Sequence, residues 1–280
     1  MVSVNFPNRN EGVAVLVDLD RCIACRACQV ACKDWNGRTR VRIEPLGGTL
    51  TSPRDLTPDD WKVVFFYEGT VGKSVGRYTF SQVEVAPLPY NCLHCVEAPC
   101  ARACPVGAIE VSRSGAVVIV RDRCIGCGYC LNACPFDVPR RGDDGKYYKC
   151  TFCADRIENG RAPACVEVCP ADVFKFGPAD EIYQKAREEA KKGRRVYGLE
   201  LNGYVGGSTR WIFVASERKA FAIEKKLPKD TQVAEMAARE ALAKIATVAL
   251  PILAVGAAAV GLAAWRNYRK EVSKEKQREE

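Results

Sequence analysis

Residues 92–135 read CLHCVEAPCARACPVGAIEVSRSGAVVIVRDRCIGCGYCLNACP and contain two groups of four cysteines. In each group, three closely spaced cysteines are followed by a fourth that directly precedes Pro105 or Pro135. Three such sulfurs converge on one metal cluster, whereas the fourth serves the other cluster. A proline ends each loop because its φ is locked and it has no N–H to donate. Gly126 and Gly128 allow backbone amides to approach the cluster closely.

Cysteine quartets of related spacing occur on both sides of this stretch, although Cys32 is not followed by a proline, and together the groups account for every cysteine in the chain. This spacing is typical of [4Fe–4S] ligand runs in two-cluster ferredoxins. We therefore predict four [4Fe–4S] clusters. The sixteen predicted ligands are Cys22, Cys25, Cys28, Cys32, Cys92, Cys95, Cys100, Cys104, Cys124, Cys127, Cys130, Cys134, Cys150, Cys153, Cys165 and Cys169.

Two other uses of an even cysteine count are disulfides and zinc. A chain of 280 residues buries its own core without disulfides, and bridges between cysteines so close in sequence would be strained. Zinc sites need two CxxC pairs per ion, which leaves the third cysteine and the terminal CxxxCP unexplained. The cysteine spacing therefore favours iron–sulfur clusters over disulfides and over zinc.

The formal charge of +8 does not indicate nucleic-acid binding. It counts every cysteine as neutral, whereas an oxidised cluster with four thiolates carries a charge of about −2. Four clusters would offset the excess. We therefore expect no nucleic-acid partner.

His94 is the only histidine and lies between two predicted ligands. It could hydrogen-bond to cluster sulfur and tune the potential of the cluster, or simply occupy an exposed loop. A single histidine excludes bis-histidine haem ligation within this chain and makes a Cys/His nucleophilic site improbable. We expect no catalytic residue.

The cysteine spacing and the hydrophobic pattern together predict an α+β fold of tandem, nested two-cluster ferredoxin-like domains with a hairpin insertion and one C-terminal transmembrane helix. Strands are expected at 13–19, 61–68, 77–85, 108–111, 116–121, 196–201 and 211–215, and helices at 30–35 and 180–192. The predicted domains are an outer ferredoxin-like domain (1–35 and 136–178), a β-rich insertion (36–91), an inner ferredoxin-like domain (92–135), an α/β extension (179–236), a transmembrane helix (237–266) and a cytoplasmic tail (267–280). The insertion could face a partner or cover the clusters.

Residues 245–265 contain no charge over twenty-one positions and would form a helix of about 32 Å, enough to cross a bilayer. Trp265 and Tyr268 then lie at interface depth, and a basic tail follows. A buried core helix is the alternative. The positive-inside rule places the tail in the cytoplasm and the cluster-bearing body in the periplasm, although lysines and arginines are nearly as frequent before the span. Residues 1–12 lack a signal-peptide pattern, so export would depend on a partner.

The sequence resembles the iron–sulfur β subunits of membrane-bound respiratory formate dehydrogenases over nearly its whole length. The resemblance rests on the cysteine quartets, CIGCGYC at 124–130, CPF at 134–136, YKCT at 148–151, PACV at 163–166, VGGS at 205–208, LPKD at 227–230 and the single C-terminal span. The quartets alone indicate only the superfamily, whereas the later motifs are more specific.

The resemblance implies an electron-transfer subunit of anaerobic respiration. In that family a molybdopterin-containing α subunit, with molybdenum or tungsten, oxidises formate, and a membrane γ subunit with cytochrome b haems reduces quinone. The family's pairing joins Cys22, Cys25, Cys28 with Cys169; Cys150, Cys153, Cys165 with Cys32; Cys92, Cys95, Cys100 with Cys134; and Cys124, Cys127, Cys130 with Cys104. The spacing itself supports only the last two sets.

Alternative functions remain open at the level of sequence. The protein could serve a membrane-bound nickel–iron hydrogenase or another molybdopterin oxidoreductase, such as a nitrate, thiosulfate or polysulfide reductase. A zinc- or disulfide-organised membrane scaffold without a redox role is a further alternative.

Overall fold

The computed structural model describes residues 6–40, 48–75, 77–199, 208–228, 261–262 and 264–266. The chain divides into two compact units, Met1–Val233 and Ala234–Glu280. Most of the predicted membrane span at 245–265 lies outside the described residues. Among those that are described, no helix combines the length and apolar character needed to cross a bilayer.

A four-stranded sheet joins the two ends of the first unit. Its order is β8 (Phe174–Pro178), β1 (Val13–Asp18), β10 (Trp211–Ala215) and β9 (Arg195–Tyr197). The β1–β10 pair is parallel, with Val15 opposite Trp211, and the two outer pairs are antiparallel. Parallel neighbours need a long connection, and here that connection contains all the cysteines.

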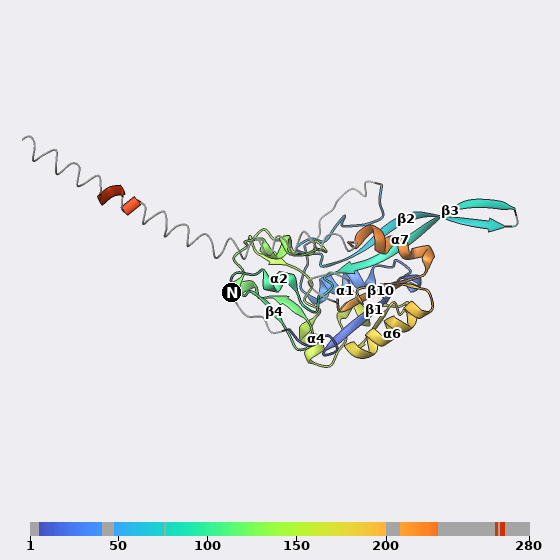
Figure 1. The fold of residues 1–280 in the computed structure, drawn as a ribbon. Coiled ribbons are helices and arrows are strands. Elements are labelled where there is room, and N and C mark those ends of the chain that lie inside the picture. The colour runs from blue at the N-terminus through green and yellow to red at the C-terminus, as the bar shows by residue number, and fades with distance from the viewer. Residues whose placement is uncertain are drawn as a thin grey trace, which may run out of the picture. The chain divides into compact units, whose positions relative to one another are not determined.

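Alternation of side chains along β1 and β10 gives the sheet two apolar faces. On one face, Leu16 and Ile212 pack with Ile182 and Tyr183 of α6 (Ala179–Lys191), which covers that face (Figure 1). The opposite face packs into the larger core, which also includes the buried cysteines. The predicted strand at 211–215 and the predicted helix at 180–192 are confirmed within one residue.

The cluster loops share a repeated local structure. A short 3₁₀ turn, η1 (Leu19–Arg21) or η2 (Arg121–Arg123), precedes Cys22 and Cys124, and α1 (Ala27–Trp35) or α3 (Tyr129–Asn132) follows. The predicted hairpin between the second and third quartets is confirmed as β4 (Ile109–Val111) and β5 (Val117–Ile119). The remaining short elements are α2 (Pro99–Arg102), β6 (Arg140–Arg141), β7 (Tyr147–Tyr148), α4 (Ala154–Glu158) and α5 (Ala164–Glu167).

The insertion forms one long hairpin of β2 (Lys62–Val75) and β3 (Tyr78–Asn91) that extends beyond the rest of the unit (Figure 1). Both strands are longer than predicted, because Gly69 and Gly72 lie within β2 rather than in the turn. A Cβ at Gly69 would come within 2.8 Å of the Phe221 ring. Gly69 is therefore explained by close packing against the ring of Phe221 and not by a turn.

The extension after the cysteines contains α7 (Glu217–Lys226), which sequence analysis did not identify. Its Ala222 and Ile223 join the main core, and its basic last turn suits a helix C-terminus. The strand predicted at 196–201 ends at Tyr197, because Gly198 adopts a positive φ beside Thr209 and Trp211.

We expect Ile182→Ala to destabilise the first unit by about 2–5 kcal/mol, because it leaves a cavity between α6 and the sheet. Ile182 is only 1% exposed. Calorimetric unfolding of the iron-loaded protein measures the effect, with exposed Lys185→Ala as a control that should change stability by less than about 0.5 kcal/mol. Equal melting temperatures for the two variants would contradict this packing.

Candidate iron–sulfur sites

Two cavities in the inner part of the unit are each lined by four cysteines. Cys92, Cys95, Cys100 and Cys134 line the first, and Cys104, Cys124, Cys127 and Cys130 line the second. In both cavities, three cysteines come from one quartet and the fourth from the other. These are the two sets that the nested spacing predicts.

The outer quartets lie close enough together for each to influence the fourth cysteine of the other. Burial raises the pKa of Cys32 well above its usual value, and the neighbouring thiolates of Cys150, Cys165 and Cys153 raise it further. Likewise, burial raises the pKa of Cys22, and repulsion from the thiolates of Cys169 and Cys25 raises it further. Contacts between α1 and α5 bring these distant segments together. The grouping is the one that the family resemblance implies.

The protein chemistry of these sites fits a multi-iron cluster. All sixteen cysteines are free thiols rather than disulfides. Among the described residues, no three Cys, His, Asp or Glu side chains lie close enough to bind a single metal ion. Four thiols around a cavity are instead suited to a cubane cluster, whose ligands bind different corners.

Backbone amides support the fourth ligand of two sets in the same way. Ala108 N–H donates to Cys104 Sγ at 3.2 Å, and Val173 N–H donates to Cys169 Sγ at 3.5 Å. In both cases the donor lies four residues after the cysteine and beyond the adjacent proline. Hydrogen bonds to ligand sulfur stabilise the thiolate and influence the cluster potential.

The cluster loops depend on residues in the left-handed backbone region. Gly126 and Gly128 have φ of 71° and 82°, and Ala24 and Arg26 have φ of 62° and 61° at the equivalent positions of the first loop. His94, Phe152 and Cys153 also have positive φ. Sequence analysis recognised only the glycines, because the other residues carry no marker of this conformation.

Burial makes the uncoordinated thiolates unfavourable. It raises the pKa of Cys28 and Cys130 to about 12, with smaller effects from neighbouring charges. It also raises the pKa of Cys100 and Cys153 to about 11. A bound metal removes this penalty because it coordinates the thiolate directly.

Two buried lysines lie among these thiolates. Burial lowers the pKa of Lys62, but Cys165, Cys28, Cys150 and Cys32 raise it above its ordinary value. The pKa of Lys149 is likewise lowered by burial, yet it is raised overall by Cys92, Cys100, Cys150 and Cys134. Sequence analysis did not identify either lysine, since a lysine gives no sequence signal of burial.

His94 is completely buried, so the exposed-loop interpretation is wrong. Its Nδ1 accepts a hydrogen bond from Val117 N–H at 2.9 Å, which places the proton of a neutral ring on Nε2. Burial, followed by Lys149 and Arg210, lowers its pKa well below the usual value. The ring stacks on Phe152 at 4.7 Å and is not among the residues that line the two cavities. Its role in tuning a cluster stays a prediction.

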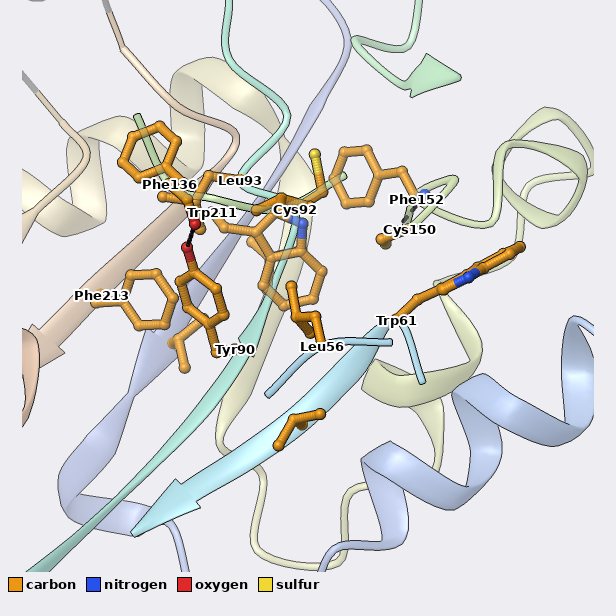
Figure 2. Packing of buried hydrophobic residues seen from close by; sticks show 14 of the residues in the cluster. Leu56, Trp61, Tyr90, Cys92, Leu93, Phe136, Cys150, Phe152, Trp211 and Phe213 are labelled. Carbon is orange, nitrogen blue, oxygen red and sulfur yellow. Dashed lines mark hydrogen bonds between the residues drawn. The ribbon is translucent and has the colours of Figure 1, made fainter. Parts of the chain in front are cut away.

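A dry aromatic core surrounds the central sites. Figure 2 shows Cys92 and Cys150 beside Phe152, with Trp211 and Leu93 in the same packed cluster. The Tyr90 hydroxyl donates to the Phe136 carbonyl oxygen at 2.6 Å, which satisfies a polar group that would otherwise be buried alone. Close packing of this kind leaves few gaps large enough for a water molecule.

The loops that carry Cys25 and Cys127 are more exposed than this core. Cys25 and Cys127 are the exposed cysteines of their groups, and the neighbouring Ile23 and Ile125 are 64% and 65% exposed. By contrast, Cys92, Cys95, Cys100, Cys150, Cys153 and Cys165 are all buried.

These features define a ferredoxin-like protein that binds several [4Fe–4S] clusters. Residues 83–179 match the family model for a 4Fe–4S dicluster domain, and residues 19–35 match that for a 4Fe–4S binding domain. The protein belongs to the family of formate dehydrogenase iron–sulfur subunits. It is 34% identical to the formate dehydrogenase iron–sulfur subunit of Haemophilus influenzae, with 93% of this chain and 83% of the relative covered.

Two other relatives extend the comparison. The nitrate-inducible formate dehydrogenase iron–sulfur subunit of Escherichia coli is 35% identical over 79% of this chain and 74% of the relative. The B subunit of the anaerobic dimethyl sulfoxide reductase of Escherichia coli is 34% identical over 60% of this chain and 75% of the relative. The similarity to the formate dehydrogenase subunits therefore extends over more of the sequence.

We expect Gly126→Ala to remove iron from the site lined by Cys124, because its Cβ would lie 2.3 Å from the Gly145 carbonyl oxygen. Ala24→Gly is the matched control, since Ala24 already has the same backbone conformation. Iron and sulfide content of the purified protein should fall in the first variant and stay unchanged in the second. Full iron content in Gly126→Ala would contradict the close approach of these loops.

Proposed function

We propose that each of the four cysteine sets binds one [4Fe–4S] cluster and that the protein relays electrons through them. Bound clusters would supply one-electron oxidation and reduction at each site. The residues of the chain hold the clusters, orient them and exclude water. No acid, base or nucleophile is needed for this task.

The observation that carries the proposal is the close packing of successive cysteine sets. Helix α2, which carries Cys100, contacts α3, which carries Cys130, and helix α1, which carries Cys28, contacts α5, which carries Cys165. Lys149 lines the cavity of the Cys92 set and donates to the carbonyl oxygen of Cys150. This packing supports a linear order of sites that starts at the Cys124 set, continues through the Cys92 and Cys150 sets, and ends at the Cys22 set.

The exposed ends of this order suit electron entry and exit. The exposed apolar residues Ile125 and Tyr129 lie close in sequence to the exposed Cys127, and Ile23 and Val30 lie close in sequence to the exposed Cys25. Exposed apolar side chains are typical of protein contact sites. We infer that redox partners dock at these two loops.

The inferred partners follow from the relatives. We infer that a molybdopterin-containing formate dehydrogenase subunit, with molybdenum or tungsten, supplies the electrons and that a membrane cytochrome b subunit receives them and reduces quinone. The relationship to the formate dehydrogenase subunits of Haemophilus influenzae and Escherichia coli supports this assignment. Another molybdenum enzyme is the second candidate, because the dimethyl sulfoxide reductase subunit is also related.

We further infer that residues 245–265 anchor the protein in the cytoplasmic membrane as a single span. The support is the run of twenty-one uncharged residues. In this arrangement the cluster-bearing unit faces the periplasm and the basic tail faces the cytoplasm.

Formate should bleach the broad visible iron–sulfur absorbance of the native complex, solubilised without oxygen and captured through this subunit. The bleaching is expected because electrons from formate would reduce the clusters. Bleaching by dithionite but not by formate would reject a formate-oxidising partner and keep the relay. Absence of cluster absorbance in intact complex would reject the relay itself.

We expect Cys127→Ser to slow electron flow from formate to quinone by at least about tenfold, because it impairs a terminal cluster of the relay. Formate oxidation with an artificial acceptor that reacts at the catalytic subunit should remain within about twofold of native. Lys185→Ala, a change at an exposed residue of α6 that belongs to neither loop, is the control. Equal loss of both activities in Cys127→Ser would contradict a pure relay role.

A further inference from the structure

Lys62 and Lys149 are unusual because their ammonium groups are buried in the cluster-bearing core. Lys62 is 1% exposed and Lys149 is 4% exposed. Within the described part of the chain, neither forms an ion pair with a carboxylate. A buried charge needs a compensating charge nearby. Here the candidate anions are cysteine thiolates.

Lys149 lies between the second and third sites of the proposed order. Its side chain lines the cavity formed by Cys92, Cys95, Cys100 and Cys134. Its Nζ donates to the carbonyl oxygens of Val117 and Cys150, the latter at 3.1 Å, and Cys150 belongs to the next set. One cation therefore faces two neighbouring sites.

Lys62 occupies the corresponding place between the third and fourth sites. At the start of β2 it pairs with Asn91 of β3, and its Nζ donates to Asn91 Oδ1 at 2.7 Å. The Nζ atom also lies 4.3 Å from the centroid of the Trp211 ring and 4.7 Å from that of Phe174. The thiolate charges that raise its pKa would come from Cys165, Cys28, Cys150 and Cys32, which belong to the two flanking sets.

The contacts of both lysines fix the charge in place. Asn91 accepts from Lys62 and donates through Nδ2 to the Cys92 carbonyl oxygen at 2.7 Å, so it is itself immobilised. Aromatic rings confine Lys62 from other sides. Other buried cations are used differently: Arg156 pairs with Glu167, and Arg210 donates to the backbone carbonyls of Arg9 and Glu11.

We propose that Lys62 and Lys149 are positioning charges that raise the reduction potentials of the clusters on either side of them. Lys149 acts on the Cys92 and Cys150 sets, and Lys62 acts on the Cys150 and Cys22 sets. A fixed positive charge in a dry core stabilises the added electron of a reduced cluster. The Cys124 set has no such lysine among the described residues. This inference rests on the proposed assignment of clusters to cysteine sets.

The test is a redox titration of the native complex followed by electron paramagnetic resonance. We expect Lys62→Met and Lys149→Met each to lower two of the potentials, because methionine keeps the length and apolar character but removes the charge. The Cys150 cluster is shared, so the double variant should lower three potentials and leave one unchanged. Arginine at either position should keep the potentials close to native.

Lys192→Met is the control, because Lys192 is exposed on the surface and pairs with Glu189. It should move no potential. Unchanged potentials in methionine variants with native iron content would overturn the inference, as would equal shifts in the methionine and arginine variants.

If a methionine variant assembles too little iron for a titration, the iron content and potentials of the arginine variant test the role of the charge instead. Full iron and native potentials with arginine would support the role of charge, whereas loss of iron in both would show that shape alone matters and overturn it. A native complex without four titrating clusters would reject the proposed function. Four native clusters whose potentials ignore both lysines would reject only this inference.

Discussion

The structure depends on placing many cysteine sulfurs in a dry interior where thiolates are poorly tolerated. Burial raises the thiol pKa at Cys28, Cys100, Cys130 and Cys153. Iron coordination offsets this cost, because the metal neutralises most of the charge and holds the sulfur as a ligand. Iron binding and folding are therefore expected to be coupled.

A cluster with four thiolates keeps a net negative charge, and this charge would account for the two lysines buried in the core. Lys62 and Lys149 are buried without a carboxylate partner in the described residues, and cysteine sulfurs lie around both. An apolar replacement would suit ordinary core packing better. Their burial fits anionic sites, which is the charge that bound clusters would have. The buried lysine charges would therefore both stabilise the folded unit and influence the proposed relay of electrons.

The scaffold meets the geometric demand by closing the chain on itself. Parallel pairing of β1 with β10 joins residues on both sides of the cysteine-containing region, and α1 meets α5 across a long sequence separation. These contacts bring Cys32 to Cys150 and Cys22 to Cys169. The hairpin β2–β3 contributes Lys62 and Asn91 from its inner end, so the insertion also takes part in the sites.

The sequence by itself determined the chemistry and much of the local structure. Cysteine spacing predicted the nested sets, and short apolar runs predicted β10 and the hairpin of β4 and β5, because these signals are local. Only the tertiary structure decided that His94 is buried, that Gly69 accommodates Phe221, and that Lys62 and Lys149 are buried among the cysteine sets. Burial and long-range electrostatic contacts depend on segments distant in sequence, so no local pattern encodes them.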